Sequence, residues 1–314
     1  MTPPLLPAYS GPPVAVVGTG PVGQTTALLL ARWGIPVVLL DARAERDEIG
    51  SKAICQQRDV LDIWSTVGAG KIAEDGLTWT TARTFYRDQE LFHWSFVDRG
   101  HSPLPAFVNI SQSHTEHVLD EQIAMQPLID VRWDHDVVDI EQTDEEVTLT
   151  CVTRDGRTQV RAAYAVAAAG ARGDRVRHLL GVTFDGQSFD DRFLICDIRA
   201  ELPGWEKERR FYFDPVWNPG RQVLIHPCPD STFRIDWQVP AEFDLEAEAA
   251  DGRLDARIRQ IIGDRPYEIV WRSVYRFHAR MVDRMRVGDM GPRRAVEQMA
   301  RERIDAAESY RRRF

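Results

Sequence analysis

Three glycines and one carboxylate near the start of the chain have the spacing of a nucleotide-phosphate site. Gly18, Gly20 and Gly23 match the pattern G-x-G-x-x-G, and Asp41 follows about 20 residues later. In such a loop the first glycine permits a tight turn, the second lets backbone approach a pyrophosphate, and the third lets a helix pack closely on a strand. An acid at the position of Asp41 can accept hydrogen bonds from a ribose diol. These four residues therefore predict dinucleotide binding.

The segments around these residues have the pattern of a β-α-β unit. Residues 14–17 are an apolar run typical of a strand buried in a parallel sheet. Residues 21–33 follow as a helix whose first amides would face the phosphates, and residues 35–40 form a second buried strand ending at Asp41. A glycine turn in some other α/β domain is the alternative, but the whole succession is more specific than the glycines alone.

Length, charge and cysteine usage restrict the class of protein. A chain of 314 residues suggests about two domains. The net charge of −9, with 39 Lys and Arg against 48 Asp and Glu, argues against a nucleic-acid partner. The four cysteines form no C-x-x-C pair, so neither a metal site nor a disulfide framework is indicated. With no signal peptide and no apolar run of about 18 residues, we expect a soluble cytoplasmic protein that does not bind a membrane.

The middle of the chain mixes helices with short strands. Residues 54–67 predict a helix with an apolar stripe, and residues 78–97 predict a hairpin that could wall a pocket. The small apolar strand at 164–168 runs into Gly170 and could make a second dinucleotide contact; alternatively, a helix crosses close to it. The remaining predicted elements are strands at 107–110, 131–140, 146–153 and 159–161, a helix at 113–124, and a short basic helix after Gly170.

The chain becomes rich in strands and aromatic residues from about residue 184. The predicted elements are strands at 193–200, 209–213, 222–227, 232–239 and 267–277, a helix at 254–262 and a charged terminal helix at 299–314. We interpret the strands as an inserted antiparallel sheet. Its aromatic side chains would mostly be core, although a sheet with so many of them could line a pocket for a planar ligand.

The order of these motifs resembles a known family. The glycine-rich unit, SKAICQQRDVLDIWSTVG, FVNISQ, AYAVAAAGARGDRVRHLLGV and VYRFHARMVDRMRVGD are similar, over about residues 14–290, to the FAD-dependent aromatic hydroxylases. These are single-component flavoprotein monooxygenases with the para-hydroxybenzoate hydroxylase fold, and the 3-(3-hydroxyphenyl)propionate hydroxylase branch is the most similar. The resemblance implies an α/β fold: a discontinuous Rossmann-like FAD-binding domain (1–80, 104–184 and 278–314) with a β-rich substrate domain (81–103 and 185–277).

The resemblance also implies cofactor contacts and two departures. The implied FAD contacts are Gly18, Gly20, Pro21, Val22, Gly23, Asp41, Ala42, Arg43, Lys52, Gln112, Val138, Gly170 and Asp289. Where the family has Asp-Gly in its middle motif, this chain has Ala169-Gly170. The family's late motif is reduced to residues 288–292, and about the last third of a typical member is missing. The chain is therefore expected to be truncated, shifted in frame, numbered without disordered segments, or a naturally shortened relative.

The implied reaction is the hydroxylation of a phenolic or polyketide-like aromatic substrate with O2 and NADH or NADPH, through a flavin C4a-hydroperoxide. The partners would be these small molecules, and the protein a monomer or homodimer. No catalytic residue is assigned; weak candidates for substrate contacts are His226, Trp237, Tyr212 and Arg272. An impaired relative that binds FAD or another nucleotide without hydroxylase activity remains an alternative. A plain NAD-dependent dehydrogenase is disfavoured because no second βαβ half follows Asp41.

Overall fold

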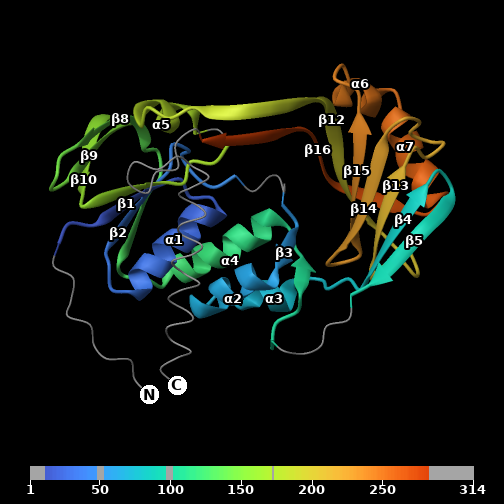
Figure 1. The fold of residues 1–314 in the computed structure, drawn as a ribbon, viewed down its shortest axis with the longest axis horizontal. Helices are drawn as coiled ribbons and strands as arrows, with labels where there is room; N and C mark the ends of the chain where they lie inside the picture. The colour runs from blue at the N-terminus through green and yellow to red at the C-terminus, as the bar shows by residue number, and fades with distance from the viewer. Residues whose placement is uncertain (1–10, 48–52, 97–101, 172, 283–314) are drawn as a thin grey trace, which may run out of the picture.

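Two lobes joined by a pair of long strands form the molecule (Figure 1). The computed structural model describes residues 11–47, 53–96, 102–171 and 173–282. The joining strands are β12 (Phe184–Ala200) and β16 (Tyr267–Val282), which pair antiparallel along their length. They pass from the lobe that contains the N-terminal strand to the lobe that contains the larger sheet (Figure 1).

The first lobe is built on a four-stranded parallel sheet in the order β11-β1-β2-β7. Its strands are β1 (Val14–Val17), β2 (Val37–Leu40), β7 (Ile129–Arg132) and β11 (Tyr164–Ala167). β1 and β2 are buried along their whole length, as their unbroken apolar sequences predict. Helix α1 (Pro21–Arg32) connects them, so the predicted β-α-β unit and the mixed α/β fold class are confirmed.

Different layers cover the two faces of this sheet. Helices α1 and α4 (Gln112–Ala124) pack on one face, where Val14, Val16 and Leu39 belong to a shared core. On the other face, Ala15 and Leu40 pack against an antiparallel sheet of β8 (Asp136–Gln142), β9 (Val147–Thr153) and β10 (Gly156–Ala162), with the short helix α5 (Asp174–Leu179) beside it. The alternation of side chains along each strand explains why both faces need apolar cover.

Two predicted elements in this lobe are correct only in part. The predicted helix at 54–67 begins instead as strand β3 (Cys55–Gln57), which pairs with β6 (Phe107–Asn109) before α2 (Arg58–Thr66) and α3 (Lys71–Asp75) follow. The predicted strand at 131–140 is two strands in different sheets, β7 and β8, separated by a turn at Asp134 with φ of 58°. In both places a long-range strand pairing overrides the local apolar pattern.

The second lobe is a seven-stranded sheet in the order β16-β12-β15-β14-β13-β4-β5. Its further strands are β4 (Thr81–Tyr86), β5 (Gln89–Ser95), β13 (Glu208–Phe213), β14 (Gln222–Cys228) and β15 (Thr232–Val239). The predicted hairpin is β4 and β5, and it joins this sheet by a parallel pairing of β4 with β13. The sheet is therefore not wholly antiparallel, because the hairpin enters it from a distant part of the chain.

Helices α6 (Leu245–Ala250) and α7 (Arg253–Ile262) cover one face of the large sheet. Leu254, Ile258 and Ile262 of α7 pack with inward residues of β12, β14 and β15 in a single core. No helix in the described ranges is long and apolar enough to cross a membrane. The predicted helix at 299–314 lies outside the described residues.

Candidate functional site

The three glycines after β1 serve two different physical needs. A Cβ atom on Gly18, whose φ is +112°, would lie 2.4 Å from the backbone oxygen of Ala168. A Cβ atom on Gly23 would lie 1.8 Å from the backbone oxygen of Gly18. Gly20 differs, because no atom of a described residue lies within 4 Å of its Cβ position. Two glycines thus let the turn, helix and β11 pack together, and the third presents bare backbone to open space.

The N-terminus of α1 begins at this open backbone. Gly20 is the N-cap residue and supplies no side-chain hydrogen bond, and Pro21 occupies the first turn without an N–H. The amides of Val22 and Gly23 have no acceptor within the helix, and the helix dipole adds partial positive charge there. The Val22 side chain is 69% exposed, so nothing in the described chain closes this end. This geometry fits the diphosphate of a dinucleotide.

Asp41 at the end of β2 holds the glycine loop in shape. Its Oδ2 accepts hydrogen bonds from the Thr19 amide at 3.0 Å and from the Thr19 hydroxyl at 2.7 Å. Its Oδ1 accepts from the Arg43 amide and from Arg43 Nε, at 3.0 and 2.9 Å. Burial by itself would raise the pKa of Asp41, but the hydrogen bonds from Arg43 and Thr19 outweigh it and lower that pKa to about 2.

The Asp41 carboxylate therefore already uses most of its acceptor sites within the protein. Arg43 Nη2 donates both to Asp41 Oδ2 and to the Thr19 hydroxyl, each at 3.0 Å. For Asp41 to accept from a ribose diol, as the sequence suggested, the half-buried guanidinium of Arg43 has to release it. Ala42 lies between these two residues in the loop after β2.

Arg46 ties the glycine loop to helix α4, and the sequence interpretation missed it. Its Nη1 donates to Glu116 Oε2 at 2.9 Å, its Nη1 and Nη2 donate to the Thr19 carbonyl at 3.2 and 3.1 Å, and it also pairs with Asp120. Gln24 of α1 donates to Asp120 Oδ1 at 2.7 Å. One more arginine in a polar loop carries no distinguishing signal in the sequence, because its acidic partners on α4 are 70 and 74 residues away.

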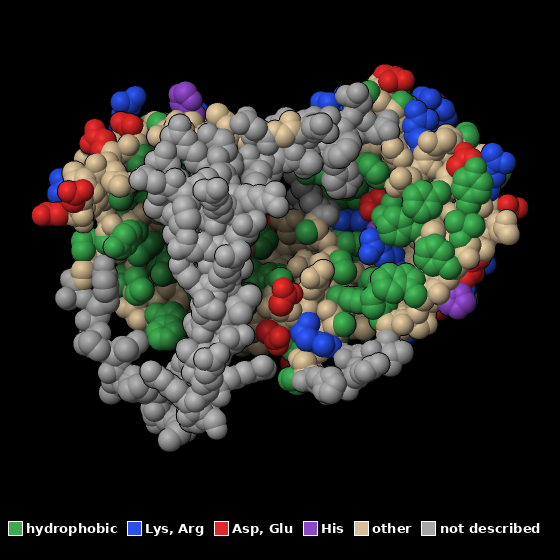
Figure 2. All heavy atoms as spheres, in the orientation of Figure 1, with side chains coloured by type: hydrophobic (Ala, Val, Ile, Leu, Met, Phe, Trp, Pro, Cys, Tyr) green, Lys and Arg blue, Asp and Glu red, His purple; other side chains and the backbone are tan. Residues whose placement is uncertain are grey.

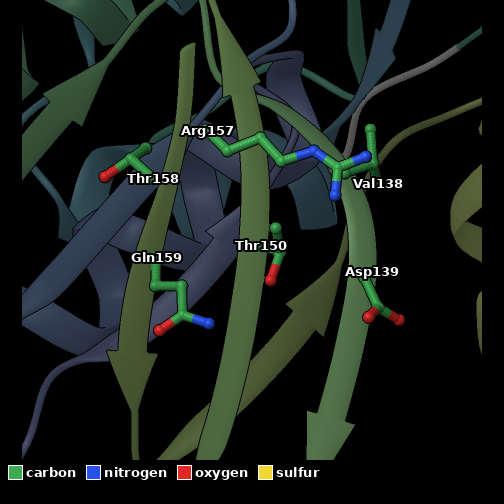
Figure 3. A pocket seen from close by; sticks show the side chains of 6 residues that line it. All are labelled: Val138, Asp139, Thr150, Arg157, Thr158 and Gln159. Carbon is green, nitrogen blue, oxygen red and sulfur yellow. The ribbon is translucent and has the colours of Figure 1, made fainter.

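The other predicted cofactor residues are dispersed. Gln112 opens α4, where its Nε2 donates to Glu116 Oε1 at 2.8 Å. Gly170, with φ of +64°, follows the edge strand β11. Val138 lies at an irregularity in β8 and lines a shallow cavity of about 820 Å³ on the three-stranded sheet β8–β10 (Figure 3). Lys52 and Asp289 lie outside the described residues.

The β8–β10 cavity does not adjoin the glycine loop by any contact that the structure gives. Thr150 lines it and alternates along β9 with Leu149 and Cys151, which face the core against β1 and β2 (Figure 3). The cavity walls are mainly polar strand residues that project from the layer. The second cavity, described below, is therefore the better candidate for the substrate site.

A run of contacts leads from the glycine loop to that second cavity. The Thr19 carbonyl accepts from Arg46, Arg46 pairs with Glu116, and Glu116 accepts from Gln112. Gln112 Oε1 in turn lies 3.4 Å from the amide of Ala53, two residues before Cys55. Cys55 and Gln57 of β3 line the second cavity. The dinucleotide loop and the second cavity are thus linked by one series of contacts through Arg46, Glu116 and Gln112.

The second cavity has a volume of about 800 Å³ and is lined mainly by aromatic rings. It lies where β3 and β6 meet the edge of the large sheet, and Figure 2 shows ring-bearing side chains gathered over the second lobe beside the hollow between the lobes. A flat apolar molecule fits such walls. The lining residues are Cys55, Gln57, Trp79, Ala82, Thr84, Phe92, Trp94, Phe96, Phe107, Arg209, Phe211 and Phe213.

A second polar residue, the buried His226, lies next to Arg209 on the same face of the sheet. His226 follows Ile225, which pairs with Arg210, so His226 lies beside Arg209 on the neighbouring strand. His226 Nε2 is 3.4 Å from Asp236 Oδ2. Burial lowers the pKa of His226 although Asp236 opposes the shift, which favours a neutral imidazole. Burial also lowers the pKa of the Arg209 guanidinium.

Three of the four candidate substrate residues point away from the cavity. Trp237 is fully buried in the core under α7, and Tyr212 stacks on Phe85 with ring centroids 4.6 Å apart. Arg272 pairs in register with Cys196, a residue of that same core, and its guanidinium is 3.8 Å from Glu246 of α6. His226 lies on the cavity side of the sheet without lining the cavity. Sequence could not separate the two faces, because both carry aromatic residues.

Comparisons with known proteins agree with this geometry. A family model described as FAD binding domain matches residues 12–290. Para-nitrophenol 4-monooxygenase of Pseudomonas sp. strain WBC-3 is 27% identical and aligns over 88% of this chain and 68% of its own. The 3-(3-hydroxy-phenyl)propionate/3-hydroxycinnamic acid hydroxylase of Mycobacterium sp. strain JLS is 26% identical over 88% of this chain. The probable NADH-specific resorcinol 4-hydroxylase of Rhodococcus jostii is 29% identical over 85% of it. This chain spans 48% and 50% of those two relatives.

Solved structures share the fold. The crystal structure of p-nitrophenol 4-monooxygenase PnpA from Pseudomonas putida DLL-E4 matches with a TM-score of 0.75 at 24% identity, over 88% of this chain and 71% of that one. The flavin-dependent monooxygenase PieE, solved with FAD and substrate, matches with a TM-score of 0.75 at 22% identity, over 91% of this chain and 53% of that one. At these identities the likeness establishes the arrangement of the two lobes.

Proposed function

Since the chain belongs to the FAD-binding domain family of aromatic hydroxylases, we propose that it is a monooxygenase that uses FAD, NADH or NADPH, and O2 to hydroxylate a small aromatic molecule. The observation that carries the proposal is the pairing of a dinucleotide loop with a ring-lined cavity through the contacts of Arg46, Glu116 and Gln112. The named activities of the relatives, all on aromatic compounds, support the substrate class.

The described residues fit FAD at its diphosphate end. The amides of Val22 and Gly23 would hold the diphosphate against the open backbone of Gly20. Asp41 would hold the adenosine ribose once Arg43 turns away, and Arg43 would then be available to a phosphate or the adenine. Gln112, at the start of α4, lies on the route from the loop to the cavity and would contact the flavin half.

The protein's own tasks follow from the cavity. When bound, FAD supplies the redox chemistry by taking electrons from the nicotinamide and activating O2. The aromatic walls bind the substrate ring and exclude water from it. The hairpin β4–β5 contributes Phe92 and Trp94 to those walls, so it positions the ring from the side opposite β3. The name of the Rhodococcus relative supports a nicotinamide as the source of electrons.

The domain division and the location are part of the same proposal. We assign 1–80, 104–184 and 278–314 to the FAD-binding domain and 81–103 and 185–277 to the substrate domain. The described lobes support this division, although the boundary after 184 falls at the start of β12 and the boundary after 277 falls inside β16. The four cysteines are free thiols, which supports a reducing, cytoplasmic location.

A second function is favoured by one specific feature. Ala169-Gly170 stands where the family motif has Asp-Gly, and Ala169 packs against the glycine loop beside Gly18. A chain without that carboxylate could bind FAD and lack hydroxylase activity.

One preparation distinguishes these functions. The purified chain is reconstituted with excess FAD, and its flavin absorbance, its substrate-stimulated oxidation of NADH or NADPH, and ¹⁸O from O2 in the product are measured. Flavin together with a labelled hydroxylated product is the expected result. Flavin without product selects the second function, and failure to retain flavin overturns both.

A further inference from the structure

One charged side chain lines the aromatic cavity and has no ion-pair partner among the described residues. Among the described residues that line the cavity, Arg209 of β13 carries the charged side chain. Its guanidinium lies 5.6 Å from the ring centre of Trp79 and 5.1 Å from that of Phe211. These rings hold the cation at the cavity wall and shield it from water.

No group in the described chain neutralises Arg209. Its Nε is buried without a hydrogen-bond partner, and it forms no ion pair with a described carboxylate. Asp236 is close enough to act electrostatically, but the contact it makes is with His226, at 3.4 Å. The buried Nε is out of a ligand's reach, so the donors that face the cavity are those of the two terminal Nη atoms, which bind no described residue.

Two other arginines of the same sheet have the carboxylate partner that Arg209 lacks among the described residues. Arg210, the next residue along β13, points to the opposite face, donates to Glu208 at 2.8 Å and lies 3.9 Å from the ring centre of Trp205. Arg234 on β15 makes a two-pronged pair with Asp197 at 2.7 and 2.8 Å. Both have a carboxylate partner, whereas Arg209 has none in the part of the chain that the structure describes.

A half-buried cation without a counter-charge is costly, and an anion that arrives with a ligand lowers that cost. In apolar surroundings a guanidinium–carboxylate contact is short, strong and directional. The molecule as a whole carries a charge of −9, so a local cation is needed to receive an anion at all. A volume of about 800 Å³ accommodates a ligand of two or three fused rings.

We infer that the cavity selects aromatic acids, with Arg209 binding the carboxylate while Trp79, Phe211 and the neighbouring rings sandwich the aromatic system. This rests on the proposed function, in which the same cavity receives the substrate. The inference adds the charge of that substrate and the residue that recognises it. Arg209 is a specificity-determining residue and takes no part in electron or oxygen transfer.

The test is a matched ligand pair on the full-length, FAD-reconstituted protein. Binding of 6-hydroxy-2-naphthoate and of 6-hydroxy-2-naphthamide is measured by titration calorimetry; the two differ in one charge at nearly equal shape. We expect the acid to bind at least about 10-fold more tightly than the amide. Equal affinities in the wild-type protein overturn the inference.

Three variants test whether Arg209 is the source of the preference for the acid over the amide. Arg209→Met should bring the ratio of affinities close to one by weakening the acid alone, and Arg209→Lys should keep part of it. Arg199→Met is the control, since Arg199 is half-exposed on β12 and paired with Glu268 away from the cavity; it should keep the full ratio. A preference retained by Arg209→Met contradicts the inference. If that variant does not fold, the wild-type ratio and Arg209→Lys still decide.

Failure of this inference can be distinguished from failure of the proposed function. Protein that retains flavin and hydroxylates a ring, yet binds acid and amide equally, contradicts this inference alone. Protein that prefers the acid but never retains flavin contradicts the proposed function alone.

Discussion

At the scale of single residues, one sequence motif contains positions with different constraints. Gly18 and Gly23 are required by atoms of the protein itself, because a Cβ at either position would collide with backbone. Gly20 has an ordinary φ of −71° and open space around it, so the fold does not require a glycine there. Because no described residue requires glycine at this position, we expect the requirement to come from a ligand.

Gly20→Val should therefore separate binding from stability. The added side chain occupies the space where the diphosphate would approach, so FAD affinity should fall by at least about 100-fold. The thermal midpoint without FAD should stay close to that of wild type. Gly70→Val is the control, because Gly70 also has a negative φ, −59°, and open space at its Cβ position, but it caps α3. Unchanged flavin affinity in Gly20→Val would place the cofactor elsewhere.

Asp41 should contribute a pH-dependent part of the stability. Its pKa in the folded protein is about 2, below the ordinary 3.8, so its stabilising effect is complete above about pH 4 and is lost as pH falls toward 2. Between pH 5 and 2, wild type should lose about 1–2 kcal/mol more unfolding free energy than Asp41→Asn. Urea unfolding at several pH values measures the difference in unfolding free energy between the two proteins. The contributions of all other carboxylates cancel in that difference. Parallel pH curves for the two proteins would show that Asp41 is not held as described.

At the scale of elements, close approach of α1 to the turn after β1 fixes the cofactor end of the first lobe. The Gly23 Cα sits where no side chain fits against the Gly18 carbonyl, and Ala168 of the following segment packs 3.5 Å from the same point. Gln24, the next residue of α1, then reaches α4 through Glu116 and Asp120. The helix is thus positioned by backbone contact on one side and by a buried amide on the other.

Gly23→Ala should break this packing. A methyl group 1.8 Å from a carbonyl oxygen forces α1 away from β1, and we expect a loss of about 3 kcal/mol or failure to accumulate folded protein. Gly20→Ala, three residues earlier, should change the stability by less than about 0.5 kcal/mol. Urea denaturation of both variants gives the comparison. Equal stabilities would mean that the turn relaxes without cost.

At the scale of the whole molecule, the long strands β12 and β16 join the two lobes, and the buried side chain of Asn109 also couples them. Asn109 of β6 is fully buried; its Nδ2 donates to the Pro227 carbonyl of β14 at 2.8 Å, and its Oδ1 accepts from Trp79 Nε1 at 3.2 Å. It joins the first lobe to the large sheet beside the aromatic cavity, which Trp79 lines. The cavity therefore keeps its shape only while the lobes stay together.

Asn109→Ala should loosen that coupling. Two buried polar groups lose their partners, so we expect a destabilisation of about 2 kcal/mol and a broader unfolding transition. Asn218→Ala is the matched control: Asn218 is also buried, but its Nδ2 donates to the carbonyls of Gln222 and Gln238 within the second lobe. It should lower stability while keeping one sharp transition. Calorimetric scans that broaden equally for both variants would contradict a coupling role for Asn109.

The sequence by itself determined the elements whose patterns are local: the buried strands β1 and β2, helix α1, the glycine turn and the hairpin β4–β5. It did not determine the pairing of β3 with β6 or of β4 with β13, because those partners are far apart along the chain. Nor could it tell Arg209, which faces the cavity, from Arg210, which faces a carboxylate. Alternation along a strand says that neighbours point to opposite faces, and only the tertiary packing decides which face becomes the site.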